Sequence, residues 1–229
     1  MNSWHSYPSI YNMGHRAIAS LLDGPVLVEE KIDGSQVSFG VTEDGEIKVR
    51  SKGAVIHPDA PEKMFTEAVA TVKDLAPNLK PGWTYRGEYL KKPKHNSLAY
   101  NRTPIAHIML FDINDGYESY LSYEQKQAEA IRLGLEVVPL LFSGKVESVE
   151  QFRSFIDRKS VLGGQKIEGV VVKPVNYDLF GADKKVLMGK FVSEAFREVH
   201  RMERKKSNHS SGDILDILWY GVQVDSQVE

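Results

Sequence analysis

The sequence has 229 residues, of which 41% are hydrophobic and 10% aromatic, and its formal net charge is −2. These values suit one large folded domain with or without a small appendage, and they exclude a disordered chain. They also exclude binding of nucleic acid through overall charge, so any basic surface must be local. The absence of cysteine excludes disulfides, thiolate metal sites and cysteine nucleophiles. With no apolar signal core and no apolar run of 18 residues, we expect a cytoplasmic protein that spans no membrane.

The pattern of apolar residues predicts both helices and strands along the chain. Turns such as Asp23-Gly24-Pro25 and the hairpin signal Asp44-Gly45 separate them. In chain order the predicted elements are a helix at 14–22, strands at 26–32, 35–41 and 46–50, a helix at 61–75, strands at 83–90 and 105–113, a helix at 123–134, a strand at 136–141, a helix at 148–158, strands at 167–173 and 184–192, and a helix at 193–206. This irregular order favours an α+β fold with antiparallel sheets.

The polar, small residues at 205–212 are typical of a linker. We therefore expect one domain over residues 1–206. Residues 207–229 are expected to form a linker and a short C-terminal segment, which is too small for a full second domain.

The segment V-L-V-E-E-K-I-D-G-S at residues 26–35 ends an apolar strand with a lysine among carboxylates. In an extended chain Glu29, Lys31 and Asp33 share one face, and Gly34 lets the backbone turn or approach a ligand. A lysine in this setting is a candidate nucleophile, but attack on phosphorus requires the neutral amine. Taken alone, so short a segment is better explained as a surface ion-pair cluster.

Charged residues also stand beside glycines in other apolar strands. The segments are R-S-K-G at 50–53, R-G-E-Y at 86–89, L-F-D-I at 110–113, E-G-V-V-V-K at 168–173 and the strand that ends near Lys190. Each alone has an ordinary structural interpretation, such as a core position for the aromatic ring or a solvent-facing strand charge. Because buried charges need partners, we expect these strands to meet at one cleft. Such a cleft would offer cations for phosphates, carboxylates for metal and ribose, and an aromatic ring for a base.

Together with K-I-D-G at 31–34, these segments resemble motifs I, Ia, III, IIIa, IV and V of the covalent nucleotidyltransferases in order and rough spacing. This superfamily contains the ATP-dependent polynucleotide ligases and the mRNA capping enzymes. The resemblance covers residues 26–198. It implies an α+β nucleotidyltransferase fold of the ligase adenylation type (ATP-grasp-like), with largely antiparallel sheets flanked by helices. The chain is most similar to phage RNA ligases of the RNA ligase 2 type.

Two positions separate the chain from parts of this superfamily. Gln36 stands where DNA ligases of this group usually carry arginine, and Ser35-Gln36 is closer to the small polar residue and amide of the RNA ligases, which more often use asparagine. Met188 stands where the family often has the first of two motif V lysines, which leaves Lys190 as the second.

The resemblance implies an ATP-dependent RNA ligase active in RNA repair. Lys31 would attack the α-phosphorus of ATP to form lysyl-AMP, AMP would pass to a 5′-phosphate end, and a 3′-hydroxyl would seal the break. The implied contacts are Lys190, and as a second candidate Lys173, to the α-phosphate; Arg50 to phosphate; Glu88 to the ribose; Phe111 to adenine; Glu168 to Mg²⁺ or Mn²⁺; and backbone groups near Glu29 and Glu30 to the adenine edge.

The RNA must be held by a local basic surface. One candidate consists of Lys91, Lys92, Lys94 and Arg102, interleaved with His95, Tyr89 and Tyr100. The other is residues 200–206, where the cations would equally well complement a helix dipole. We expect a monomer that acts on RNA, such as a nicked duplex or a DNA–RNA hybrid.

Three alternatives remain at this level. The first is an ATP-dependent DNA nick ligase, against which Gln36 argues. The second is capping-type chemistry with GTP, although the E-G-V-V-V-K run resembles the ligases more than the capping enzymes. The third is a non-catalytic relic that binds nucleic acid, although binding alone would not require Lys31.

Overall fold

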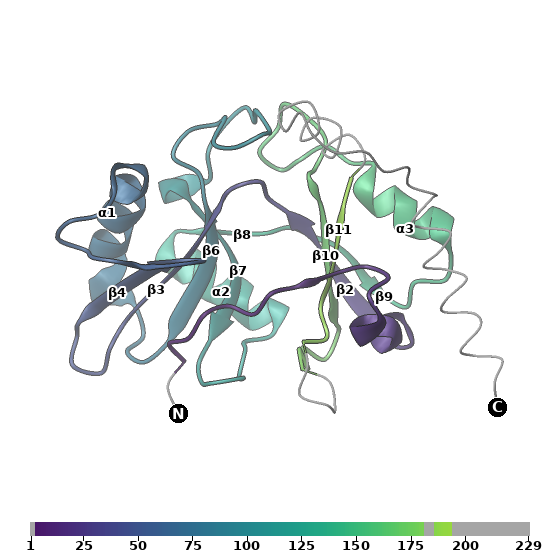
Figure 1. The fold of residues 1–229 in the computed structure, drawn as a ribbon, viewed down its shortest axis with the longest axis horizontal. Coiled ribbons are helices and arrows are strands. Elements are labelled where there is room, and N and C mark those ends of the chain that lie inside the picture. Colours follow the sequence, from purple (N-terminus) through teal and green to yellow (C-terminus); the bar gives the residue numbers. More distant parts are fainter. Residues whose placement is uncertain (1–2, 181–185, 194–229) are drawn as a thin grey trace. The chain divides into compact units, whose positions relative to one another are not determined.

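The computed structural model describes residues 3–180 and 186–193, which form two compact units (Figure 1). Unit 1 contains residues up to 8, 33–138 and 162–164, and unit 2 contains the other described residues. Each unit has its own sheet and its own hydrophobic core. The predicted helix at 193–206, the predicted boundary at 206 and the segment 207–229 lie outside the described residues, except for Ser193.

Unit 2 is built on a five-stranded sheet. Its strands, in spatial order, are β1 (Tyr11–Asn12), β11 (Gly189–Val192), β10 (Gly169–Pro174), β2 (Val26–Lys31) and β9 (Leu140–Gly144), and only the β1–β11 pair is parallel. One face is apolar, with Val28, Val170 and Phe191 packed against Phe152 and Phe155 of α3 (Val149–Ile156). The 3₁₀ helix η1 (Arg16–Leu22) adds Ile18 and Leu21 to the same core.

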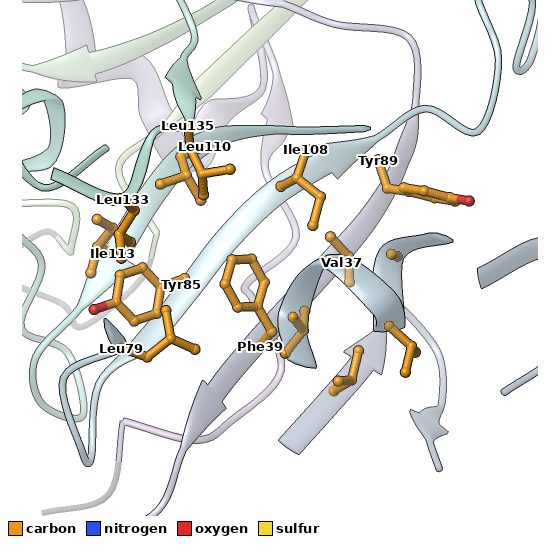
Figure 2. Packing of buried hydrophobic residues seen from close by; sticks show 14 of the residues in the cluster. Val37, Phe39, Leu79, Tyr85, Tyr89, Ile108, Leu110, Ile113, Leu133 and Leu135 are labelled. Atoms are coloured by element: carbon orange, nitrogen blue, oxygen red, sulfur yellow. The ribbon is translucent and has the colours of Figure 1, made fainter. Parts of the chain in front are cut away.

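Unit 1 is built on a six-stranded sheet. Its strands, in spatial order, are β5 (Val55–Ile56), β4 (Ile47–Ser51), β3 (Ser35–Val41), β6 (Thr84–Tyr89), β7 (Ile108–Asn114) and β8 (Glu136–Val137), and only β7–β8 is parallel. The helices are α1 (Thr66–Leu75) and α2 (Tyr123–Leu133), with 3₁₀ turns η2 (Lys63–Phe65), η3 (Ala76–Asn78) and η4 (Ile105–His107). Figure 2 shows the core on one face of this sheet, where Phe39 stacks on Tyr85 with ring centroids 5.4 Å apart.

A β-bulge interrupts the pairing of β6 with β7. Arg86 is opposite Asp112, but the next residue, Gly87, is opposite Leu110, so Phe111 is the extra residue on β7. The bulge moves Asp112 to the face opposite the core while Leu110 and Ile113 both stay in the core. Bulges of this kind redirect side chains and are over-represented beside active sites.

The α+β class and the largely antiparallel sheets are as predicted, with local differences. Helix α2 begins at a capping box formed by Ser122 and Gln125 and ends at Gly134 with φ of 68°, the left-handed value that glycine adopts easily. The segment 14–22 is a 3₁₀ helix interrupted at Ile18. Residues 105–107 form a 3₁₀ turn instead of the start of a strand. Among the described residues of the predicted strand 184–192, only Gly189–Val192 is a strand. None of the helices in the described ranges is long and apolar enough to cross a membrane.

Candidate active site

The sheet of unit 2 has a charged face opposite its apolar core. Residues paired across a sheet point to the same face, and Glu29, Val171 and Lys190 form one such row across β2, β10 and β11. Lys31 is paired with Gly169 in the next row along the same face. The prediction that Glu29 and Lys31 share a face is thus confirmed, and Lys190 joins them.

Lys31 is bound to a carboxylate from another strand. Its Nζ donates a hydrogen bond to Oε2 of Glu168 at 2.9 Å. The Lys31 side chain is 24% exposed and that of Glu168 is 6% exposed. The Glu168 carbonyl also accepts a hydrogen bond of 2.8 Å from the Ser193 amide, next to the end of β11. The candidate nucleophile and the candidate metal ligand therefore form one partly exposed ion pair.

A second ion pair lies on the same face and is fully buried. Nζ of Lys173 donates to Oε2 of Glu29 at 2.7 Å, and both side chains are 1% exposed. The same ammonium donates to the Tyr177 hydroxyl at 3.1 Å. A buried ion pair is held together strongly because removal of one partner leaves a desolvated charge. This arrangement commits Lys173 to Glu29, whereas Lys190 is half-buried.

Glu30 points to the other face of β2. Its carboxylate accepts hydrogen bonds from the Ser160 hydroxyl at 2.6 Å and from the Val161 amide at 3.1 Å. Burial raises the pKa of Glu30, although these two hydrogen bonds oppose the change. The Glu30 amide donates to the Pro139 carbonyl at 3.0 Å. The side chain of Glu30 therefore fastens the 160–161 segment and does not join the charged face.

The K-I-D-G segment turns away from β2 immediately after Lys31. Asp33 belongs to unit 1, where its Oδ2 accepts hydrogen bonds from the amides of Ser97 at 2.9 Å and Leu98 at 2.7 Å. Its own amide donates to the Tyr100 hydroxyl at 2.9 Å. The prediction that Asp33 continues the face of Lys31 is therefore wrong, because β2 ends at Lys31 and the carboxylate binds a backbone loop instead.

The loop at 95–100, which binds Asp33, also binds Ser35, the first residue of β3. His95 Nδ1 accepts a hydrogen bond of 3.0 Å from the Lys91 amide, which leaves Nε2 to carry the proton and donate to the Ser35 hydroxyl at 2.9 Å. Burial lowers the pKa of His95, against the opposing effect of Asp33. Asn96 adds a hydrogen bond of 2.7 Å to the Gly34 carbonyl. Residues 95–100 thus hold the turn at 33–35 through side chains and backbone together.

The sheet of unit 1 also has a polar face opposite its core. Arg50, Ser38, Arg86 and Asp112 form one row across β4, β3, β6 and β7, and Gln36 is paired with Glu88 in a parallel row. The predicted phosphate contact Arg50 and the predicted ribose contact Glu88 are both half-buried on this face. The structure thus places these two residues on one surface of unit 1.

Arg86, which motif reasoning did not assign to the site, anchors the N-terminal segment. It is fully buried and donates to the Ser38 hydroxyl at 3.0 Å and to the carbonyls of His5 at 2.7 Å and Ser3 at 3.2 Å. Burial lowers the pKa of the Arg86 guanidinium. The position of Arg86 inside an apolar strand was a sign in the sequence that it has buried partners. No sequence pattern indicates that these partners include the backbone carbonyls of Ser3 and His5.

Phe111, the predicted adenine contact, is the half-buried bulge residue of β7. The ring of Tyr7 meets it edge-on with centroids 5.0 Å apart. The Tyr7 hydroxyl donates a hydrogen bond to the buried Asp112 carboxylate. The N-terminal segment therefore contacts both residues at the bulge.

The four predicted RNA contacts differ in their surroundings. Arg102 forms a two-pronged ion pair with Glu136, with distances of 2.9 and 2.7 Å, and these hydrogen bonds raise its pKa. Lys91 lies 3.2 Å from Glu67 and donates to the Lys63 carbonyl. Lys92 and Lys94 are exposed. The second candidate region, 200–206, lies outside the described residues.

The family model described as RNA ligase matches residues 24–192. No curated protein matches the sequence. A Naegleria gruberi RNA ligase variant solved with ATP and Mn has a TM-score of 0.67 and 19% identity, covering 86% of this chain and 58% of that chain. The same ligase with PPi gives 0.66 and 20%, with the same coverages. A further variant with AMP and Mn gives 0.64 and 18%, covering 88% and 60%. The chain thus spans less than two thirds of the length of these ligases. The TM-scores show that the fold is shared, and at identities this low the similarity shows the fold alone.

Proposed function

Because the chain belongs to the RNA ligase family, we propose that it is an ATP-dependent RNA ligase that carries AMP covalently on Lys31. The observation that carries this proposal is the 2.9 Å contact between Nζ of Lys31 and Glu168 on the charged face of the unit 2 sheet. Its structural neighbours include ligases solved with ATP and Mn and with AMP and Mn, which supports ATP as the nucleotide.

In the first step the neutral amine of Lys31 attacks the α-phosphorus in line with the leaving group. An N–P bond forms, the bond from the α-phosphorus to the bridging oxygen breaks, and pyrophosphate departs. Lys31 must lose a proton before attack. Its partner Glu168 accepts a hydrogen bond from that amine, and the negative charge of this carboxylate favours the protonated form of Lys31.

A divalent cation fits these residues. Within the described part of the chain no three His, Asp or Glu side chains lie close enough to form a metal cage. Mg²⁺ commonly uses one or two carboxylates together with substrate phosphates, and Glu168 supplies a suitable oxygen. When bound, Mg²⁺ or Mn²⁺ would supply positive charge that favours the neutral amine and offsets charge on the phosphates.

The remaining contacts to the nucleotide are assigned by the chemistry of each side chain. The buried pairing of Lys173 with Glu29 favours Lys190 as the contact to the α-phosphate. We assign Arg50 to phosphate, Glu88 to the ribose and Phe111 to the adenine ring. An aromatic face stacks on a purine with little demand on hydrogen-bond geometry.

The later steps need an RNA end. AMP passes from Lys31 to the 5′-phosphate, and attack by a 3′-hydroxyl joins the strands and releases AMP. Exposed Lys92 and Lys94 are suited to contact backbone phosphates. A DNA nick ligase is the second candidate; Gln36, which pairs with Glu88 on β6, argues against it because that group of ligases usually has arginine there.

The test begins with self-adenylation. Purified protein is incubated with α-labelled ATP or GTP and Mg²⁺ and analysed on denaturing gels, with Lys31→Ala as the control. We expect covalent label from ATP in the wild type and none in the variant. Label in Lys31→Ala, or none in the wild type, contradicts the proposal, and label from GTP alone favours capping-type chemistry. Nicked RNA and DNA duplexes added to the labelled protein then distinguish the two ligase functions.

A further inference from the structure

Helix α2 carries a lysine where an apolar residue is expected. The buried residues of the helix are Tyr123, Lys126, Glu129, Ala130 and Leu133. Lys126 is fully buried, with an exposed fraction of 0%. Lysine is almost never fully buried unless its ammonium group is paired. The partners of Lys126 therefore indicate why the position is charged.

Those partners lie at the β7 bulge. Nζ of Lys126 donates a hydrogen bond of 2.6 Å to the carbonyl of Phe111 and lies 3.8 Å from Oδ1 of Asp112. It also sits over the ring of Tyr123, 4.9 Å from the centroid. Asp112 is itself fully buried. The ammonium thus contacts the backbone of the extra residue and the side chain of the residue that follows it.

The bulge determines where the Phe111 ring can point. A bulge residue stands outside the strand register, so the regular ladder constrains its backbone less than that of its neighbours. Lys126 supplies a charge-assisted hydrogen bond at that residue. An apolar side chain at 126 would serve the helix core equally well, but it could not bind the Phe111 carbonyl.

We propose that Lys126 is a positioning residue for the purine base of the nucleotide: it fixes the Phe111 backbone so that the ring keeps its stacking orientation. This inference rests on the proposed function, because it takes Phe111 as the contact to adenine. The ring of Tyr7 packs against the same ring in a T-shaped arrangement. Lys126 itself contacts no nucleotide and acts through Phe111.

The experiment measures the KM for ATP and the maximal rate of self-adenylation in Lys126→Met, Phe111→Ala and the double variant. Lys126→Met keeps the length of the side chain and removes the charge. We expect each single variant to raise the KM for ATP roughly tenfold with less than about a threefold change in maximal rate. The double variant should have the KM of Phe111→Ala, because residues that act through one another are not additive.

Glu129→Gln is the matched control, because it also neutralises a buried charge on α2. The Glu129 carboxylate accepts hydrogen bonds from Tyr85 and Arg132 instead of contacting the β7 bulge. It should lower the melting temperature and leave the KM for ATP unchanged. Lys126→Gln serves as a second variant and should raise the KM if Lys126→Met fails to fold. Loss of folding in both variants would assign Lys126 to stability alone and overturn the inference.

The two proposals fail in distinguishable ways. Absence of self-adenylation in the wild type contradicts the proposed function. If the wild type is labelled but Lys126→Met has an unchanged KM, or if the two single effects multiply in the double variant, only the inference is overturned. A normal KM in Phe111→Ala likewise removes the inference and leaves the ligase function intact.

Discussion

Nζ of Lys31 lies 2.9 Å from Oε2 of Glu168, so the candidate nucleophile at the end of β2 is paired with the carboxylate that precedes β10. The pairing has a chemical consequence, because a carboxylate stabilises the ammonium form while attack requires the amine. A divalent cation held by Glu168 would offset the charge of this carboxylate and so favour the neutral amine. The function of Lys31 is therefore expected to depend on Glu168.

The first prediction concerns Glu168→Gln. Loss of the carboxylate should slow self-adenylation by roughly 10²–10³-fold, as for other groups that stabilise charge in a transition state. The rate of labelling is measured as a function of Mg²⁺ and Mn²⁺ concentration. Glu147→Gln, an exposed residue of unit 2, is the control and should behave as wild type. A Glu168→Gln variant with the wild-type rate and metal dependence would refute the assignment.

The second prediction concerns the buried pair of Lys173 and Glu29. Lys173→Met should lower the free energy of unfolding by about 3–5 kcal/mol, because the Glu29 carboxylate stays buried without its cation. The double variant with Glu29→Leu should recover much of this loss, since it removes both charges. Denaturant unfolding monitored by circular dichroism gives the values. Lys145→Met, at an exposed position, should cost less than about 0.5 kcal/mol, and equal losses at 145 and 173 would count against the buried pair.

The third prediction concerns His95 and pH. Burial lowers the pKa of His95 below its ordinary value of 6.5, so the unfolded chain binds the proton more readily than the folded chain. The stability from neutral His95 is thus fully present above pH 6.5 and is lost as the pH falls toward the folded-state pKa. Protonation of Nδ1 would also remove the acceptor for the Lys91 amide.

Melting temperatures between pH 7.5 and 5 test this prediction. The wild type should lose stability toward the acidic end more steeply than His95→Gln, which has no titrating group there. The comparison isolates His95 from His5, whose pKa is also lowered by burial. Parallel curves for the two proteins would show that His95 does not contribute.

The fourth prediction concerns the basic surface of unit 1. Replacement of Lys92 and Lys94 by alanine should weaken RNA binding and reduce the slope of log K against log salt by roughly 1.5. The reason is that binding with fewer phosphate contacts releases fewer counterions from the RNA. Arg102→Ala should have a smaller effect on the slope, because Glu136 already neutralises that guanidinium. Fluorescence anisotropy with a 5′-phosphorylated RNA at several salt concentrations provides the slopes. A larger effect at 102 than at 92 and 94 would reverse this assignment.

Local sequence patterns could predict the strands that carry the motifs. They could also predict which side chains share a face of β2. Alternation along β2 placed Glu29 and Lys31 on one face, and the pairing register bears this out. Alternation failed at Asp33, because a strand end depends on tertiary contacts, here with the amides of Ser97 and Leu98.

Other parts of the site depend on relationships between distant segments. The extra residue at Phe111 arises from how β7 pairs with β6, and no local pattern marks a register shift. Lys126 interrupts the apolar stripe of α2, and that irregularity was a visible signal, but its meaning required the position of the Phe111 carbonyl. The backbone partners of Arg86 come from residues 3 and 5, which carry no motif.

Gly34 illustrates how little clearance the turn after Lys31 allows. A Cβ atom at this position would lie 2.8 Å from Cδ1 of Leu90 and 2.9 Å from the carbonyl oxygen of Tyr89. Because the Tyr89 carbonyl is backbone, even alanine at position 34 would have to displace the end of β6. Substitutions intended to change the surroundings of Lys31 therefore have no room for a side chain at position 34.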